Sequence, residues 1–140
     1  MKIEFFTEDI AFPPIKRIKT RNWIKQIAAV YKKRIGEINY IFCSDEKILE
    51  INREHLQHDY YTDIITFDNN ENDRISGDLF ISLETVKSNA EKFGTQYEEE
   101  LFRVIIHGIL HLCGQADKTP KDSTIMKQKE DAALKLLAAL

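Results

Sequence analysis

The spacing of apolar residues along the chain alternates between the periods of strands and of helices. Short β-branched and aromatic runs predict strands, whereas apolar residues that recur every three or four positions predict helices with one buried face. The predicted strands cover residues 2–8, 38–43, 62–67 and 77–82. The predicted helices cover residues 15–34, 45–56, 83–94, 96–112 and a last segment that begins at Pro120. This order of elements predicts an α+β fold in which helices pack on a mixed four-stranded β-sheet.

Serine and glycine residues mark the expected ends of several elements. Ser44 and Ser82 are suitable N-caps, because a serine hydroxyl can accept a hydrogen bond from a free amide of the first helical turn. Gly36 and Gly94 are expected to end helices, since glycine adopts the left-handed conformation without steric cost. The hydrophilic connection over residues 68–74 is short, so the third and fourth strands are expected to run antiparallel.

The helix predicted over residues 96–112 is expected to lie centrally, and it carries two histidines in the stretch His107-Gly-Ile-Leu-His111. A spacing of four residues returns the chain to the same helix face, so both imidazoles can face one metal ion. Gly114 suits the turn after this helix. Asp117 would then come round as a third ligand.

The metalloprotease pattern His-Glu-x-x-His-x-x-Gly-x-x-His has the same frame, with two differences. Gly108 stands where a protease has its glutamate general base, which disfavours peptide hydrolysis. Asp117 stands where the third histidine would be. Two imidazoles and one carboxylate bind Zn²⁺ and leave a position open for water, so the pattern predicts a catalytic site with one zinc ion per chain. Asp122 is the reserve third ligand, and ordinary core or surface histidines are the alternative interpretation.

Basic residues gather in one segment of a chain whose net charge is −3. Eight of them, and no acidic residue, lie between Ala11 and Gly36, so one basic element is expected on an acidic body. Such a stripe is typical of contact with RNA phosphates, and a solvated helix face is the alternative. The RNA-binding candidates are Lys16, Arg17, Lys19, Arg21, Lys25, Lys32, Lys33 and Arg34.

Length and composition limit the class of protein. A chain of 140 residues is expected to form a single domain over residues 1–140, with its own hydrophobic core. No apolar run approaches the roughly 20 residues of a membrane-spanning helix, and the first residues do not resemble a secretory signal, so a cytoplasmic protein without membrane contact is expected. Cys43 and Cys113 are then expected to be free thiols.

Three motifs together resemble the YbeY family of bacterial rRNA-maturation endoribonucleases. They are His-Gly-x-Leu-His-Leu-x-Gly from His107, Thr-Asp-Ile-Ile-Thr-Phe from Thr62, and Gly-Asp-Leu-Phe-Ile from Gly77. The resemblance implies a single-domain metalloprotein, usually zinc-bound, that acts on RNA in small-subunit rRNA maturation and ribosome quality control. It also implies partners: rRNA, ribosomal particles and a ribosomal or assembly-factor protein.

The sequence departs from the family pattern at two places that matter for chemistry. The usual Tyr-Asp-His after the glycine is Gln-Ala-Asp here, so Asp117 takes the position of the third histidine ligand. Leu56 stands where the family commonly has an arginine that is thought to help catalysis. Arg53 and His58 are the catalytic candidates that would substitute for it, and a histidine titrates near neutral pH.

Three functions remain open on the sequence alone. The first is a metal-dependent endoribonuclease of the single-strand type. The second is a ribosome-assembly or RNA-binding factor in which the metal only stabilises the fold. The third is a metalloprotease-like hydrolase.

Overall fold

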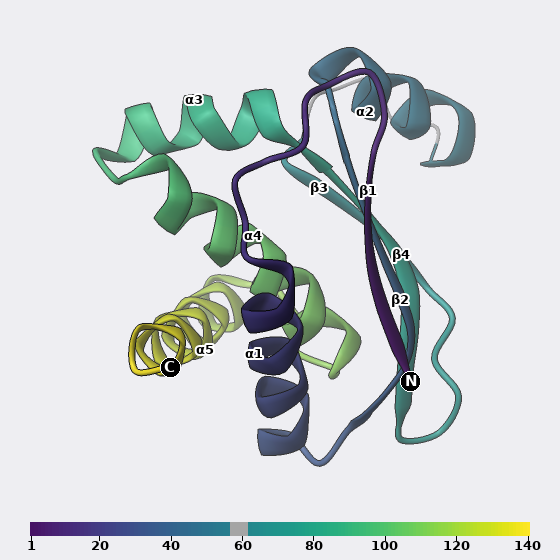
Figure 1. The fold of residues 1–140 in the computed structure, drawn as a ribbon, viewed down its shortest axis with the longest axis vertical. Helices are drawn as coiled ribbons and strands as arrows, with labels where there is room; N and C mark the ends of the chain where they lie inside the picture. Colours follow the sequence, from purple (N-terminus) through teal and green to yellow (C-terminus); the bar gives the residue numbers. More distant parts are fainter. Residues whose placement is uncertain (57–61) are drawn as a thin grey trace.

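The computed structural model describes residues 1–56 and 62–140 (Figure 1). Its strands are β1 (Lys2–Thr7), β2 (Arg34–Cys43), β3 (Ile64–Asp68) and β4 (Arg74–Ser82). Its helices are α1 (Arg17–Val30), α2 (Asp45–Ile51), the π-helical η1 (Asn52–Leu56), α3 (Leu83–Phe93), α4 (Tyr97–Leu112) and α5 (Pro120–Ala138). The α+β fold class predicted from the pattern is confirmed.

The four strands form one mixed sheet in the order β1-β2-β4-β3. The pairs β1–β2 and β2–β4 are parallel. Helix α1 returns the chain between β1 and β2, and strand β3, which runs opposite to β4, returns it between β2 and β4. The strands β3 and β4 are antiparallel, as their short connection predicts. Strand β3 thereby becomes an edge of the sheet, next to the strand against which α4 packs.

Helices α1, α3, α4 and α5 lie on one side of the sheet, and α2 lies on the other side at one end (Figure 1). The helix α4 contacts α1, α3, α5, β3 and β4, so it holds the central position predicted for it. Two buried hydrogen bonds anchor these layers: the Tyr40 hydroxyl donates to the carbonyl of Ile105 at 2.7 Å, and the Trp23 indole donates to the carbonyl of Ala133 at 2.8 Å. Each large apolar side chain buried here stabilises the fold by about 1.5–3 kcal/mol relative to leaving it exposed.

The predicted caps are present where they determine the direction of helices. The side chain of Ser44 accepts a hydrogen bond from the amide of Lys47, and that of Ser82 accepts one from the amide of Thr85. Gly94 has a φ of 69° and ends α3 in the left-handed conformation. These caps place α2 and α3 directly after β2 and β4, at the same end of the sheet.

The first predicted helix, over residues 15–34, is too long. Helix α1 ends at Val30, Lys32 takes a left-handed φ of 60°, and Arg34 already begins β2. Gly36 therefore does not end a helix. It lies inside β2, where a Cβ atom would overlap the side-chain oxygen of Ser76 on β4, so the glycine is needed for the close approach of two strands.

Other boundaries also differ from the prediction, among them the start of β4, which lies at Arg74 rather than at residue 77. The helix expected over residues 45–56 is α-helical only to Ile51 and then widens into the π-helix η1, and β3 begins at Ile64 rather than at residue 62. Cys43 and Cys113 are free, as predicted. Within residues 1–56 and 62–140, none of the helices combines the length and the apolar character that crossing a bilayer requires.

Candidate metal site on helix α4

Helix α4 brings His107 and His111 to the surface near its C-terminal end. Three glutamates at positions 98–100 open this helix, where acidic residues favour the positive end of the helix dipole. His107 is half-buried and His111 is exposed one turn later. Gly108, next to His107, faces the core, where a Cβ atom would overlap the end of the Leu79 side chain. The helix thus presents histidines outward and a glycine toward the sheet.

The two nitrogens of the His107 ring face two different carboxylates. Nδ1 lies 2.7 Å from Oε2 of Glu130 on α5, and Nε2 lies 3.8 Å from Oδ2 of Asp117. The chain reaches Asp117 through Gly114, whose φ of 102° turns it back toward the helix. The structure therefore brings together His107 and Asp117, two of the three predicted ligands.

The third predicted ligand, His111, does not lie close enough to His107 and Asp117 for the three side chains to bind one ion as they stand. Among residues 1–56 and 62–140, no three side chains of the histidine, cysteine or acidic type are gathered tightly enough to hold a metal ion. Two atoms bound to one zinc ion at about 2.1 Å each lie about 3.4 Å apart in tetrahedral geometry. The 3.8 Å between Nε2 of His107 and Oδ2 of Asp117 is close to that separation, and His111 is exposed at the surface. The donor set of two imidazoles and one carboxylate fits Zn²⁺, and it also suits Mn²⁺ or Fe²⁺.

Charges around His107 favour a cation at this place. Burial by itself would lower the pKa of His107, but the hydrogen bond to Glu130 and the charges of Glu130, Asp63 and Asp117 raise this pKa above its ordinary value. Burial raises the pKa of Asp63, although the charge of His107 opposes this effect, and burial also raises the pKa of Glu100. Several carboxylates therefore surround the His107 imidazole.

A groove of about 690 Å³ runs past Asp117, Glu130 and Arg103 to the exposed ring of Phe93 at the end of α3. Neither Arg103 nor Glu130 belongs to the candidates predicted from the sequence. Arg103 precedes His107 by four residues and so shares its helix face, which is a signal that the sequence contains. Glu130 follows His107 by 23 residues on another helix, and only the packing of α5 against α4 shows the contact.

Asp122, the reserve ligand, has another role in the structure. It forms a capping box with Thr119 at the start of α5: the Thr119 side chain accepts from the Asp122 amide at 3.0 Å, and the Asp122 side chain accepts from the Thr119 amide at 3.4 Å. The Asp122 carboxylate, which would bind the metal ion if Asp122 were the third ligand, is therefore engaged in this helix cap.

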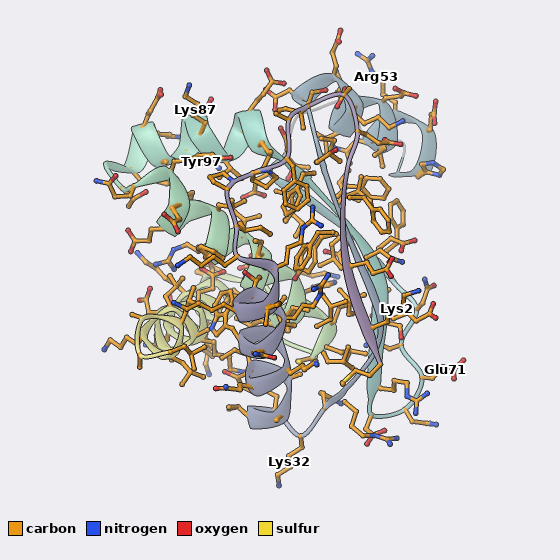
Figure 2. All side chains as sticks on the ribbon, in the orientation of Figure 1. Lys2, Lys32, Arg53, Glu71, Lys87 and Tyr97 are labelled. Carbon is orange, nitrogen blue, oxygen red and sulfur yellow. The ribbon has the colours of Figure 1, made fainter. Side chains whose placement is uncertain are left out.

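Arg53, one of the two catalytic candidates, does not line the groove beside His107. His58 lies outside the described residues. Arg53 lies on η1 at the upper end of the molecule, whereas the last turns of α4 run toward the lower part (Figures 1 and 2). Arg53 lines a different surface hollow, together with residues of α2 such as Glu46 and Glu50. The catalytic roles of Arg53 and His58 remain predictions.

The eight RNA-binding candidates do not form one helix face. Lys16 occupies the N-cap position of α1, and α1 itself carries Arg17, Lys19, Arg21 and Lys25. Lys32 and Lys33 lie in the turn, with Lys32 at the lower tip of the molecule, opposite to the end that carries Arg53 (Figure 2).

Some of these cations have contacts within the protein. The Nε of Arg21 donates to the carbonyl of Ile3 at 2.8 Å, and the guanidinium of Arg17 lies 4.2 Å from the centre of the Phe12 ring. Arg34 on β2 forms an ion pair with Asp73 at 3.0 Å.

The turn after α1 gathers several of the candidates at one place. Lys25, Lys33 and Arg34 line a hollow of about 330 Å³ with Arg74, the first residue of β4. Arg74 is not among the eight candidates predicted from the sequence, because only the parallel pairing of β2 and β4 brings it beside Arg34.

Comparison with known proteins places the whole chain in one family. The family model described as Endoribonuclease YbeY matches residues 4–138. The chain is 66% identical over 134 residues to the Endoribonuclease YbeY of Bacteroides fragilis, covering 96% of each chain, and 62% identical over 134 residues to that of Bacteroides thetaiotaomicron, covering 96% of this chain and 98% of the relative. The solution structure of TM1509 from Thermotoga maritima aligns with a TM-score of 0.70 and 27% identity, over 96% of this chain and 88% of that one.

These matches confirm the resemblance carried by the three sequence motifs. They extend it from those motifs to nearly the full length of the chain. The protein therefore belongs to the YbeY family of endoribonucleases, hydrolases that cut RNA phosphodiester bonds.

Proposed function

We propose that the protein is a metal-dependent endoribonuclease whose metal ion is held by His107, His111 and Asp117. Family membership supports the hydrolysis of RNA. The observation that supports this particular site is the half-buried His107, whose Nδ1 faces Glu130 and whose Nε2 faces Asp117 across 3.8 Å. Carboxylates around the imidazole provide the negative charge that a divalent cation needs.

Each residue of the proposed site has a distinct task. His107 and His111 offer imidazole nitrogens from one helix face, and Asp117 adds a carboxylate from the turn after Gly114. A zinc ion bound there would supply Lewis acidity toward a phosphodiester oxygen and an acidified water. The carboxylate of Asp117 places more negative charge on the ion than a third histidine would. We infer that this makes the ion a slightly weaker Lewis acid and that Mn²⁺ or Fe²⁺ would be tolerated.

The basic residues supply contacts to the RNA backbone in this proposal. Lys25, Lys33, Arg34 and Arg74 surround one hollow at the end of α1, and Lys16, Arg17, Lys19 and Arg21 lie at the other end of that helix. Phosphate contacts of this kind are electrostatic, so binding should weaken steeply as salt is raised. The RNA is expected to be rRNA within ribosomal particles, met in the cytoplasm during small-subunit maturation and quality control.

Nothing observed favours the two alternatives. The relatives that match the chain carry the endoribonuclease name rather than that of an assembly factor. A protease would need a glutamate at position 108, but Gly108 faces Leu79 and Ile64 in the core. A longer side chain there would have no space in which to reach a substrate.

The proposal is tested by incubating the purified, metal-analysed protein with a structured RNA, with and without a chelator. We expect the chelator and the double change His107→Ala, His111→Ala to remove both zinc and cleavage, and added zinc to restore cleavage only to the wild type. His55→Ala is the matched control, because His55 is an exposed histidine on η1. Cleavage that persists in the double variant would contradict the proposed site.

A further inference from the structure

A buried carboxylate joins helix α5 to helix α4 beside His107. Only 7% of Glu130 is exposed, and both of its carboxylate oxygens are engaged. Oε2 lies 2.7 Å from Nδ1 of His107, and Oε1 lies 3.0 Å from Nη1 of Arg103. Because each oxygen has its own partner, the carboxylate cannot turn without breaking one of these two contacts.

Arg103 fixes this arrangement from the same helix that carries the histidine. Arg103 and His107 are four residues apart on α4, so their side chains lie on one face, opposite Glu130 on α5. The second terminal nitrogen of Arg103 reaches Asp131 at 2.7 Å. The guanidinium is therefore also held at two points, and charge-assisted pairs of this kind are strong and directional.

The contact with Glu130 determines which nitrogen of His107 carries the proton. An ionised carboxylate only accepts hydrogen bonds, so Nδ1 must be the donor. In the neutral ring, Nε2 is then left unprotonated, and it is Nε2 that faces Asp117. A metal ligand needs that unprotonated nitrogen, and histidine ligands commonly donate their other N–H group to a carboxylate.

We propose that Glu130, itself held by Arg103, is a positioning residue that prepares His107 to bind the metal ion through Nε2. This inference rests on the proposed function, because it takes His107 to be a metal ligand. It assigns a positioning role to Glu130 and Arg103, which do not belong to the pattern of metal ligands. Glu130 acts through His107 and does not itself touch the RNA.

The decisive variant is Glu130→Gln, with Asp131→Asn as its matched control. Glutamine has one amide oxygen, so it can accept from His107 or from Arg103 but not from both, and its NH₂ group then opposes the other donor. The control Asp131→Asn removes a carboxylate of the same charge from the same arginine and leaves His107 untouched. A role limited to holding α5 against α4 would change stability without changing the state of the imidazole.

Two measurements follow, zinc affinity by competition with a chromophoric chelator and the tautomer of His107 by ¹⁵N NMR of the metal-free protein. We expect Glu130→Gln to weaken zinc binding by about 10–100-fold and Asp131→Asn to leave it unchanged. We expect the wild-type neutral ring to be protonated at Nδ1, and the Glu130→Gln protein to lose this preference. Equal zinc affinity in wild type and Glu130→Gln would overturn the proposal.

The NMR measurement on the wild type needs no variant to fold, and a neutral ring protonated at Nε2 would also overturn the proposal. Failure of the proposed function looks different. In that case zinc affinity would be insensitive to the replacement of His107 and His111, whatever tautomer the metal-free ring adopts.

Discussion

Replacing Gly108 by alanine tests how closely α4 must approach the sheet. A Cβ atom at this position would overlap Cδ2 of Leu79 and would lie 3.0 Å from Cδ1 of Ile64, where carbon atoms ordinarily sit about 3.5–4.0 Å apart. Leu79 is fully buried, so its side chain has no open space into which it can turn. Either α4 moves away from the sheet or the core adopts strained rotamers.

The expected cost combines two opposing effects. Overpacking a core by one methyl group costs about 1–3 kcal/mol, and the fully buried Leu79 puts this site in the upper part of that range. Alanine in place of glycine inside a helix stabilises the helix by about 1 kcal/mol. We therefore expect Gly108→Ala to lower the free energy of unfolding by about 1–2 kcal/mol. Any shift of α4 would also move His107, the next residue, and should reduce RNA cleavage.

This cost and its cause are measured by denaturant unfolding of four proteins: the wild type, Gly108→Ala, Leu79→Ala and the double variant. Leu79→Ala alone should cost about 2–5 kcal/mol, because it leaves a cavity. The added methyl group at position 108 would partly fill that cavity, so the double variant should lose about 1–2 kcal/mol less than the sum of the single losses. A Gly108→Ala protein as stable as the wild type, or strictly additive costs, would refute the reasoning.

Three further predictions concern the core, the thiols and the RNA contacts. Tyr40→Phe removes a buried hydroxyl that donates to an α4 carbonyl at 2.7 Å, and should lower the free energy of unfolding by about 1 kcal/mol without changing zinc affinity. Burial first, and then the charges of nearby acids, raise the pKa of Cys43 to about 12, and burial raises that of Cys113 to about 11. Thiolate is therefore scarce near neutral pH, and a thiol reagent should modify the native protein much more slowly than the unfolded one; rapid native labelling would contradict this. Lys33→Ala and Arg74→Ala should each weaken RNA binding. Each should also make the plot of log affinity against log salt less steep by the amount that about one phosphate contact contributes, and an unchanged slope would contradict RNA binding at this hollow.

The sequence predicts elements well where local chemistry decides them. Ser44 and Ser82 cap helices as expected, because the cap depends only on a side chain and the next three residues. Glycine commonly ends helices, which predicts a helix end at Gly36, but the structure uses this glycine for a close approach between strands. That role depends on a residue of another strand, which no local pattern contains.

The same distinction holds for the candidate site. The spacing of His107 and His111 is visible in the sequence, because one helix presents both. The contact of Glu130 with His107 requires α5 to fold back on α4, and 23 residues separate the two positions. Long-range packing, rather than local propensity, therefore decides which groups surround the ligand pattern.

The central claim is that Asp117 completes a metal site with His107 and His111, at the position where the sequence resemblance implies a third histidine. The most direct test measures bound zinc and RNA cleavage together in the wild type, Asp117→Ala and Asp117→His. The account predicts about one zinc per chain and cleavage in the wild type, loss of both in Asp117→Ala, and retention of both in Asp117→His, since imidazole is an equally suitable third ligand. Zinc bound as tightly by Asp117→Ala as by the wild type, with cleavage unchanged, would contradict it.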